Sequence, residues 1–97
     1  MKPKILITED DRVQRDIIAD ILLRAGYAAT GTASGAEAVE ALKDDVFDML
    51  LTDLSMPGMD GLDLLREAKR IRPDIEVVVM TAYATVATAV TAMKEGA

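Results

Sequence analysis

Residues 4–11 read KILITEDD, and this stretch decides the fold. Its apolar run, Ile5–Thr8, shows no alternation of polar and apolar side chains, which predicts a short strand buried on both faces. Strands of this kind belong to parallel sheets that are covered by helices on both sides. Three acidic residues follow directly, so the strand carries carboxylates at its carboxyl end.

Three further runs along the chain predict strands. Tyr27–Thr32 is rich in alanine and glycine, and we expect it at an edge of the sheet. Phe47–Thr52 is a second run of the buried type, and it ends at Asp53. Ile75–Met80 is the most β-branched run of the chain, and it ends at Thr81.

The first helix is predicted directly behind the quoted stretch. Val13, Ile17, Ile21 and Leu22 recur at spacings of four, four and one, with charged residues between them. This spacing places them on one apolar face of an amphipathic helix. Gly26 follows the periodic stretch and is well placed to end the helix.

Three more helical patterns alternate with the strands. Ser34 and Glu37 have the spacing of a capping box, which predicts a helix from there to about Asp44. Apolar residues recur at helical spacing over 62–71 and again over 86–93. The strand–helix unit is therefore repeated four times.

This order of elements predicts a single α/β domain with a doubly wound parallel sheet, because helical crossovers between strands make neighbours parallel and cover both faces. With a strand order of 2-1-3-4, the order reverses between the first and third strands. Ligands of such sheets bind at that point, beyond the carboxyl ends of the strands.

Composition limits the chemistry. The 97 residues are 51% hydrophobic, and 11 basic against 17 acidic side chains give a net charge of −6, without histidine, cysteine or tryptophan. The acidic balance argues against direct nucleic acid binding, and the absent residue types exclude disulfides, cysteine nucleophiles, zinc fingers and histidine bases. No apolar run approaches the roughly 20 residues that span a membrane. We therefore expect a cytoplasmic protein without membrane contact.

The strand ends carry the candidate chemistry. Glu9 and Asp10 follow the first strand, Asp53 the third and Thr81 the fourth. We expect the three carboxylates to converge at the switch point without a nearby lysine or arginine. Each carboxylate would then raise the pKa of the others, and a hard divalent cation such as Mg²⁺ would relieve the repulsion.

Each of these residues also has an ordinary structural explanation. Asp10 or Asp11 could be the N-cap of the first helix, and Asp11 is the better candidate; Asp60 is expected to cap the third helix. Asp53 could be a turn residue, and Thr81 a strand former. The coincidence of three such strand ends at one sheet edge favours a site.

Three segments resemble the receiver domain of two-component response regulators. They are residues 4–11, LTDLSMPGMDG at 51–61 and VVMTA at 78–82. The resemblance covers the whole chain and implies a flavodoxin-like receiver fold over residues 1–97. Residues 80–97 resemble the receivers of bacterial enhancer-binding transcription activators.

The resemblance implies a role for each matching residue. Asp53 would be the phosphoacceptor and, with Asp10, a ligand of Mg²⁺, while Glu9 would act on the metal through water. The backbone carbonyl of Ser55 would complete the protein ligands.

The resemblance also implies a switch and a partner. Thr81 would be the hydroxyl that turns toward the phosphoryl group, with Ala82 as its small neighbour. The donor would be a sensor histidine kinase, since this chain has no histidine. Phosphorylation would switch an output such as transcription, carried by an output domain on a longer parent chain.

The chain departs from the family after residue 97. The family's fifth strand and fifth helix are missing, and with them the lysine that contacts the phosphoryl group; none of the lysines present takes that role. The resemblance therefore implies a domain that is incomplete at the C-terminus. We expect an open edge on the fourth strand, exposed apolar surface on the first and fourth helices, and self-association, for example as a homodimer through this open face.

Two other functions remain alternatives. A protein-interaction module without phosphorylation would suit the missing lysine, but it would not explain the acidic cluster. A phosphohydrolase with an aspartate nucleophile would need a second aspartate at position 55, where this chain has Ser55. The sequence therefore favours a signalling phosphoacceptor and not an enzyme.

Overall fold

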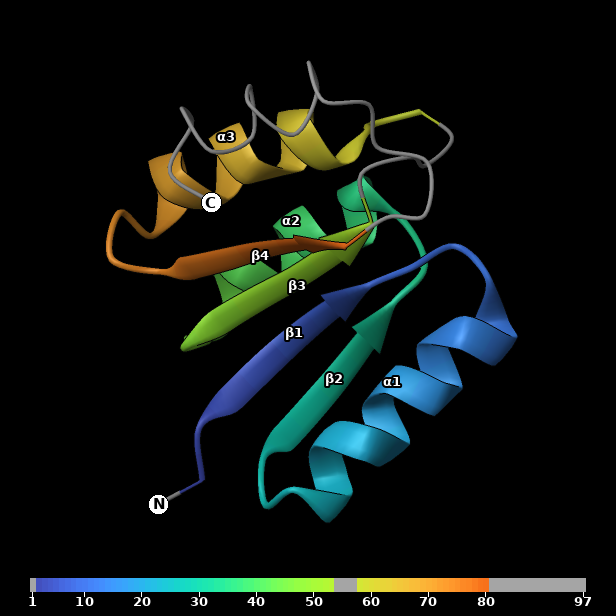
Figure 1. Cartoon of the computed structure of the whole chain (residues 1–97). Helices are drawn as coiled ribbons and strands as arrows, with labels where there is room; N and C mark the ends of the chain where they lie inside the picture. Colours follow the sequence, from blue (N-terminus) through green and yellow to red (C-terminus); the bar gives the residue numbers. More distant parts are fainter. Residues whose placement is uncertain (1, 54–57, 81–97) are drawn as a thin grey trace.

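The computed structural model describes residues 2–53 and 58–80 of the chain. Strands and helices alternate along this part of the chain, as Figure 1 shows. In order, the elements are β1 (Lys4–Thr8), α1 (Arg12–Arg24), β2 (Ala28–Thr32), α2 (Gly35–Asp44), β3 (Met49–Asp53), α3 (Gly61–Ile71) and β4 (Glu76–Met80).

The strands form one parallel sheet in the order β2-β1-β3-β4. The predicted doubly wound α/β fold with strand order 2-1-3-4 is thus confirmed. Thr8, the last residue of β1, is paired with Thr32 of β2 on one side and Thr52 of β3 on the other. The carboxyl ends of β1 and β3 therefore lie side by side at the switch point.

The two faces of the sheet are covered by different helices (Figure 1). Helix α1 lies on one face, whereas α2 and α3 lie on the other. The main core forms between the sheet and the α2–α3 face, because every second strand residue points there. Its buried members are Leu6, Ala38, Leu42, Phe47, Leu50, Leu64, Leu65, Ala68, Ile75 and Val77.

The strands differ in how deeply they are buried. The run Ile5–Thr8 of β1 is buried throughout, and β2 lies at an edge, as predicted. The prediction was wrong in part for the third strand, which begins at Met49, two residues later than Phe47, and alternates between buried and half-buried residues. The physical reason is that only its α2–α3 face is fully covered in the described structure.

The predicted helix caps are confirmed. Asp11 accepts hydrogen bonds from the second and third residues of α1, and Asp60 does the same for α3. Ser34 accepts a bond of 3.2 Å from the backbone N–H of Glu37 at the start of α2. Each cap satisfies N–H groups that have no partner inside the helix.

Helix α1 forms as predicted, and most of its apolar stripe is exposed. The side chains of Val13, Ile17 and Ile21 are 64%, 48% and 60% exposed, and only Leu22 of the predicted stripe is half-buried. The expectation of exposed apolar surface on the first helix is therefore confirmed. The described structure packs nothing over the outer side of this helix. Gly26, with a φ of 98°, follows the helix end as predicted.

Some predicted features lie outside the described residues. These are the helix over 86–93, Ser55, Thr81 and Ala82. Within the described part of the chain, β3 is the strand that pairs with β4. No helix among the described residues is long and apolar enough to cross a membrane.

Candidate functional site

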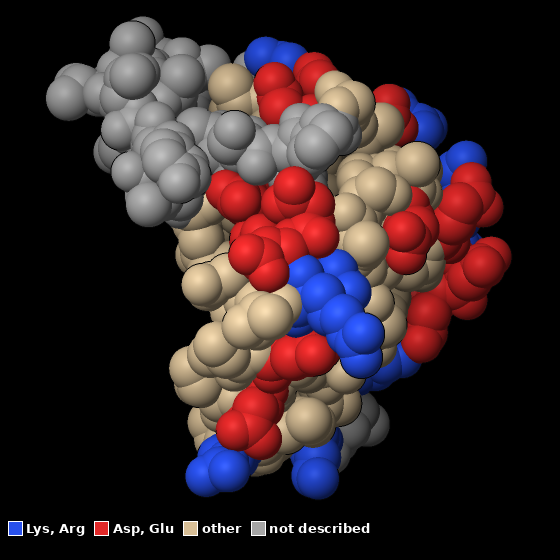
Figure 2. Space-filling view, turned by 90° about the vertical axis from the view of Figure 1, so that its right-hand side faces the viewer, with Lys and Arg blue, Asp and Glu red and all other residues tan. Residues whose placement is uncertain are grey.

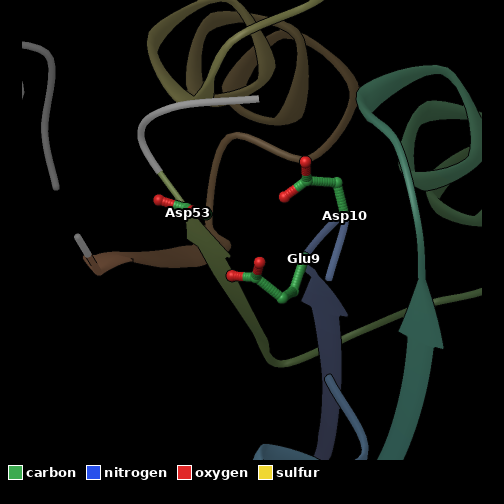
Figure 3. A group of neighbouring side chains, drawn as sticks. All are labelled: Glu9, Asp10 and Asp53. Carbon is green, nitrogen blue, oxygen red and sulfur yellow. The ribbon is translucent and has the colours of Figure 1, made fainter. Parts of the chain in front are cut away.

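Three carboxylates meet at the switch point of the sheet. Glu9 and Asp10 follow the end of β1, and Asp53 is the last residue of β3. Because Thr8 is paired with Thr52, the next residues of the two strands are neighbours. One carboxylate oxygen from each acid lies within 4.8 Å of the others, and the three side chains surround one space in Figure 3.

Buried threonines hold the strand ends beneath the acids. The hydroxyl of Thr32 donates to the carbonyl of Ile7 at 2.7 Å and lies 3.2 Å from the hydroxyl of Thr8. The hydroxyl of Thr52 donates to the carbonyl of Asp53 at 3.0 Å. Each of these three threonines is buried, so their hydroxyls find partners inside the protein.

Glu9 is the buried member of the cluster, with 8% of its surface exposed. Its backbone N–H donates to the carbonyl of Thr32 at 3.1 Å, and its carboxylate accepts a bond of 3.1 Å from the N–H of Asp11. Asp10 is exposed and Asp53 is half-buried. The site therefore combines one sheltered carboxylate with two that solvent or a ligand can reach.

Burial and neighbouring acids raise the pKa of Glu9 to about 7. Loss of hydration is the largest cause, because it disfavours the charged form. The negative charge of Asp53, and hydrogen bonds from the Glu9 carboxyl to Asp10 and Asp53, raise this pKa further, whereas the N–H of Asp11 lowers it. The predicted direction, a pKa raised by convergent acids, is thus confirmed for Glu9.

A basic side chain also reaches this end of the sheet. Arg15 of α1 donates a hydrogen bond of 2.9 Å to the backbone carbonyl of Glu9. The expectation that no lysine or arginine lies near the acids was therefore wrong. Figure 2, which views the strand ends, shows basic side chains directly beside a gathering of acidic ones.

Sequence reasoning missed Arg15 because its hydrogen-bond partner is a main-chain oxygen, and a pattern of side chains does not reveal such a partner. The one available signal was its position one turn into the helix that follows the acids. The described lysines lie elsewhere: Lys2 precedes β1, Lys4 begins β1 and pairs with Asp45, and Lys43 and Lys69 lie on α2 and α3.

The arrangement offers oxygen ligands only. Carboxylates at this separation suit a hard divalent cation, and Mg²⁺ uses few carboxylates with several waters. The exposed position of Asp10 leaves room for that water. Asp11 and Asp60 are the N-caps of α1 and α3, and they contribute no carboxylate to the cluster.

Comparison with known proteins identifies relatives of the chain. Residues 5–97 match the response regulator receiver domain family. The response regulator receiver protein CpdR of Brucella abortus is 43% identical over 84 residues, which cover 87% of this chain and 70% of CpdR. The transcriptional regulatory protein ZraR of Escherichia coli is 42% identical over 96% of this chain, which spans only 21% of ZraR.

Solved structures agree with these relatives. A CheY-like receiver domain protein from Methanospirillum hungatei superposes with a TM-score of 0.95 at 30% identity, over 100% of this chain and 78% of that one. A Burkholderia pseudomallei response regulator, solved with a phosphorylated aspartic acid, calcium ion and citrate, has a TM-score of 0.92 at 32% identity, over 99% of this chain and 56% of its own. The fold is thus flavodoxin-like, and the chain belongs to the response regulator receiver domain family of two-component systems.

Proposed function

We propose that the chain is a phosphoacceptor in which Asp53 receives a phosphoryl group. The observation that carries this proposal is the convergence of Glu9, Asp10 and Asp53 within 4.8 Å at the switch point, in a receiver domain. Asp53 ends a strand next to the two other acids. Its carboxylate can therefore attack the phosphorus atom of a phosphodonor that binds at this site.

The proposed reaction is a transfer from a phosphohistidine of a sensor kinase. A carboxylate oxygen of Asp53 forms a bond to phosphorus, and the bond between phosphorus and the histidine nitrogen breaks. The leaving imidazole takes up a proton, and the product is an acyl phosphate on Asp53. No further turnover is needed, so the domain is a signalling unit and not an enzyme.

Mg²⁺ fits the residues present. Asp10 and Asp53 are proposed as direct ligands, Glu9 as a ligand through water, and the backbone carbonyl of Ser55 as the remaining protein ligand. Their oxygen atoms are of the type that Mg²⁺ binds. When bound, the ion neutralises negative charge on the transferring phosphoryl oxygens.

The relatives support this assignment. The similar Burkholderia pseudomallei regulator was solved with a phosphorylated aspartic acid and a calcium ion, a hard divalent cation that also prefers oxygen. ZraR is a transcriptional regulatory protein, which supports an output in transcription from a longer parent chain. Thr81 and Ala82 are the proposed switch hydroxyl and its small neighbour, and residues 1–97 are the proposed receiver unit.

The test is phosphorylation of the chain by a small phosphodonor, acetyl phosphate, with Mg²⁺. Intact-mass spectrometry should show one added phosphoryl group, and the adduct should be absent from Asp53→Asn and when Mg²⁺ is chelated. Asp60→Asn is the matched control, since Asp60 caps a helix, and it should still be phosphorylated.

Two outcomes would contradict the proposal. A folded protein that forms no adduct would indicate a protein-interaction module. Continuous release of phosphate over many turnovers would indicate a phosphohydrolase.

A further inference from the structure

Arg15 occupies an unusual position for a helix arginine. It lies one turn inside α1, it is half-buried, and its guanidinium donates a 2.9 Å hydrogen bond to the backbone carbonyl of Glu9. The three ion pairs of arginine and lysine within the described helices α1 and α2 are exposed and join side chains three or four residues apart, as Arg24 does with Asp20. Arg15 instead reaches back to the loop that carries the acids.

These exposed pairs are Arg12–Asp16, Arg24–Asp20 and Lys43–Glu40. Each pair joins two exposed side chains of one helix, whereas Arg15 is half-buried and bonds to the backbone outside its helix.

The peptide groups around Glu9 are held from two sides. The N–H of Glu9 donates to the carbonyl of Thr32 on β2 at 3.1 Å, and its carbonyl accepts from Arg15 on α1. This carbonyl belongs to the peptide plane that Glu9 shares with Asp10. Its hydrogen bond therefore limits rotation of the backbone that carries the Asp10 carboxylate.

Gly31 provides the space for the Arg15 side chain. A Cβ atom at Gly31 would lie 3.2 Å from both Cγ and Cδ of Arg15, which is closer than ordinary carbon contacts. The stem of Arg15 thus passes over bare backbone of β2 on its way to the Glu9 carbonyl.

We propose that Arg15 is a positioning residue for the metal site. It fixes the Glu9–Asp10 peptide so that both carboxylates face Asp53, and Gly31 makes room for it. This inference rests on the proposed function, since it concerns the same Mg²⁺ site.

Charge and position predict opposite effects for the loss of Arg15. A positive side chain near the acids opposes the binding of a cation, so removal of its charge alone would strengthen Mg²⁺ binding. Removal of its hydrogen bond would weaken Mg²⁺ binding, because groups that orient metal ligands typically contribute about 10- to 100-fold in affinity. The sign of the change therefore separates the two roles.

The test is a calorimetric titration of the whole chain with Mg²⁺ alone at one fixed pH. Arg15→Met should weaken Mg²⁺ binding by about 10-fold, and Arg15→Lys should restore part of the loss, since a lysine can donate one bond to the carbonyl. Arg24→Met is the matched control, because it removes the same charge from the far, exposed end of α1 and should leave the affinity nearly unchanged.

A second variant keeps the charge of Arg15 and disturbs the position of its side chain. Gly31→Ala should also weaken Mg²⁺ binding, whereas Thr30→Ala, at an exposed neighbouring position of β2, should not. Thermal unfolding without Mg²⁺ shows whether each variant is folded. If Arg15→Met is not folded, the Mg²⁺ affinity of Gly31→Ala tests the proposal.

The outcomes distinguish this inference from the proposed function. Unchanged or tighter Mg²⁺ binding by Arg15→Met, with normal phosphorylation of the unmodified chain, overturns the role of Arg15 alone. Failure of the unmodified chain to bind Mg²⁺ overturns both.

Discussion

At the scale of single residues, Glu9 is the side chain whose chemistry the fold changes most. It is buried beside two other acids, and its pKa rises from an ordinary value of 4.5 to about 7. The folded protein therefore keeps a proton on Glu9 at a pH where the unfolded chain has lost it.

This difference predicts how stability depends on pH without Mg²⁺. Between the two pKa values the folded state binds more protons than the unfolded state, so the free energy of unfolding falls as the pH rises from about 5 to about 8. The loss is of the order of 1–3 kcal/mol. Urea unfolding over this range measures it, and Glu9→Gln should flatten the dependence.

Glu67→Gln is the control for this pH effect. The exposed carboxylate of Glu67 has a lowered pKa because Arg70 donates hydrogen bonds to it, so it titrates below this range. A pH dependence that persists in Glu9→Gln and disappears in Glu67→Gln would contradict the assignment.

The sequence could predict the three acids but not the arginine. Glu9, Asp10 and Asp53 each follow a recognisable strand, and parallel strands of one sheet bring their carboxyl ends to one edge. The placement of the Arg15 side chain depends on the backbone carbonyl of Glu9 and on the space above Gly31. Both are available to Arg15 only when α1 packs on β2.

At the scale of helices and strands, the helix caps were predictable because one side chain and the adjacent N–H groups form them. The exposure of the α1 face did not follow from its spacing, because helical spacing defines a face without saying what covers it; the expectation of an exposed face came from the family resemblance. Val13, Ile17 and Ile21 share a face that the described structure leaves exposed.

The cap of α1 should contribute measurable stability. Asp11→Ala removes the acceptor of two backbone N–H groups and should cost about 1 kcal/mol in the free energy of unfolding. Asp11→Ser should recover most of this loss, whereas Asp16→Ala, in the exposed middle of the helix, should cost less. Urea unfolding measures all three, and an unchanged stability in Asp11→Ala would refute the contribution of the cap.

The start of α2 is packed tightly against the segment before α3. A Cβ atom at Gly35 would lie 2.8 Å from the Cβ of Met59, and that atom cannot move without its backbone. Gly35→Ala should therefore destabilise the protein by about 1–3 kcal/mol. Ala36→Ser, at the exposed next position, should change stability by less than about 0.5 kcal/mol; equal effects of the two changes would contradict this packing argument.

At the scale of the whole molecule, exposed apolar surface should promote association. Ile17 and Ile21 lie on the outer side of α1, and adjacent apolar side chains of this kind favour contact with another protein surface. We expect the average mass in sedimentation experiments to rise with protein concentration.

Polar substitutions test this association. Ile17→Gln with Ile21→Gln should reduce it and leave the stability of the monomer nearly unchanged, because both side chains are already exposed. Val46→Gln is the matched control at an exposed position elsewhere. A monomer at every concentration would contradict the expectation.

The pairing of β1 with β3 has a consequence for folding. Glu9 and Asp53 come from strands that α1, β2 and α2 separate along the chain, so their carboxylates meet only after this whole span has folded. A partly folded chain that has not joined β1 to β3 holds no such group of acids. A cation bound there would favour the native sheet over every such intermediate, so that ligand binding and completion of the fold become one cooperative event.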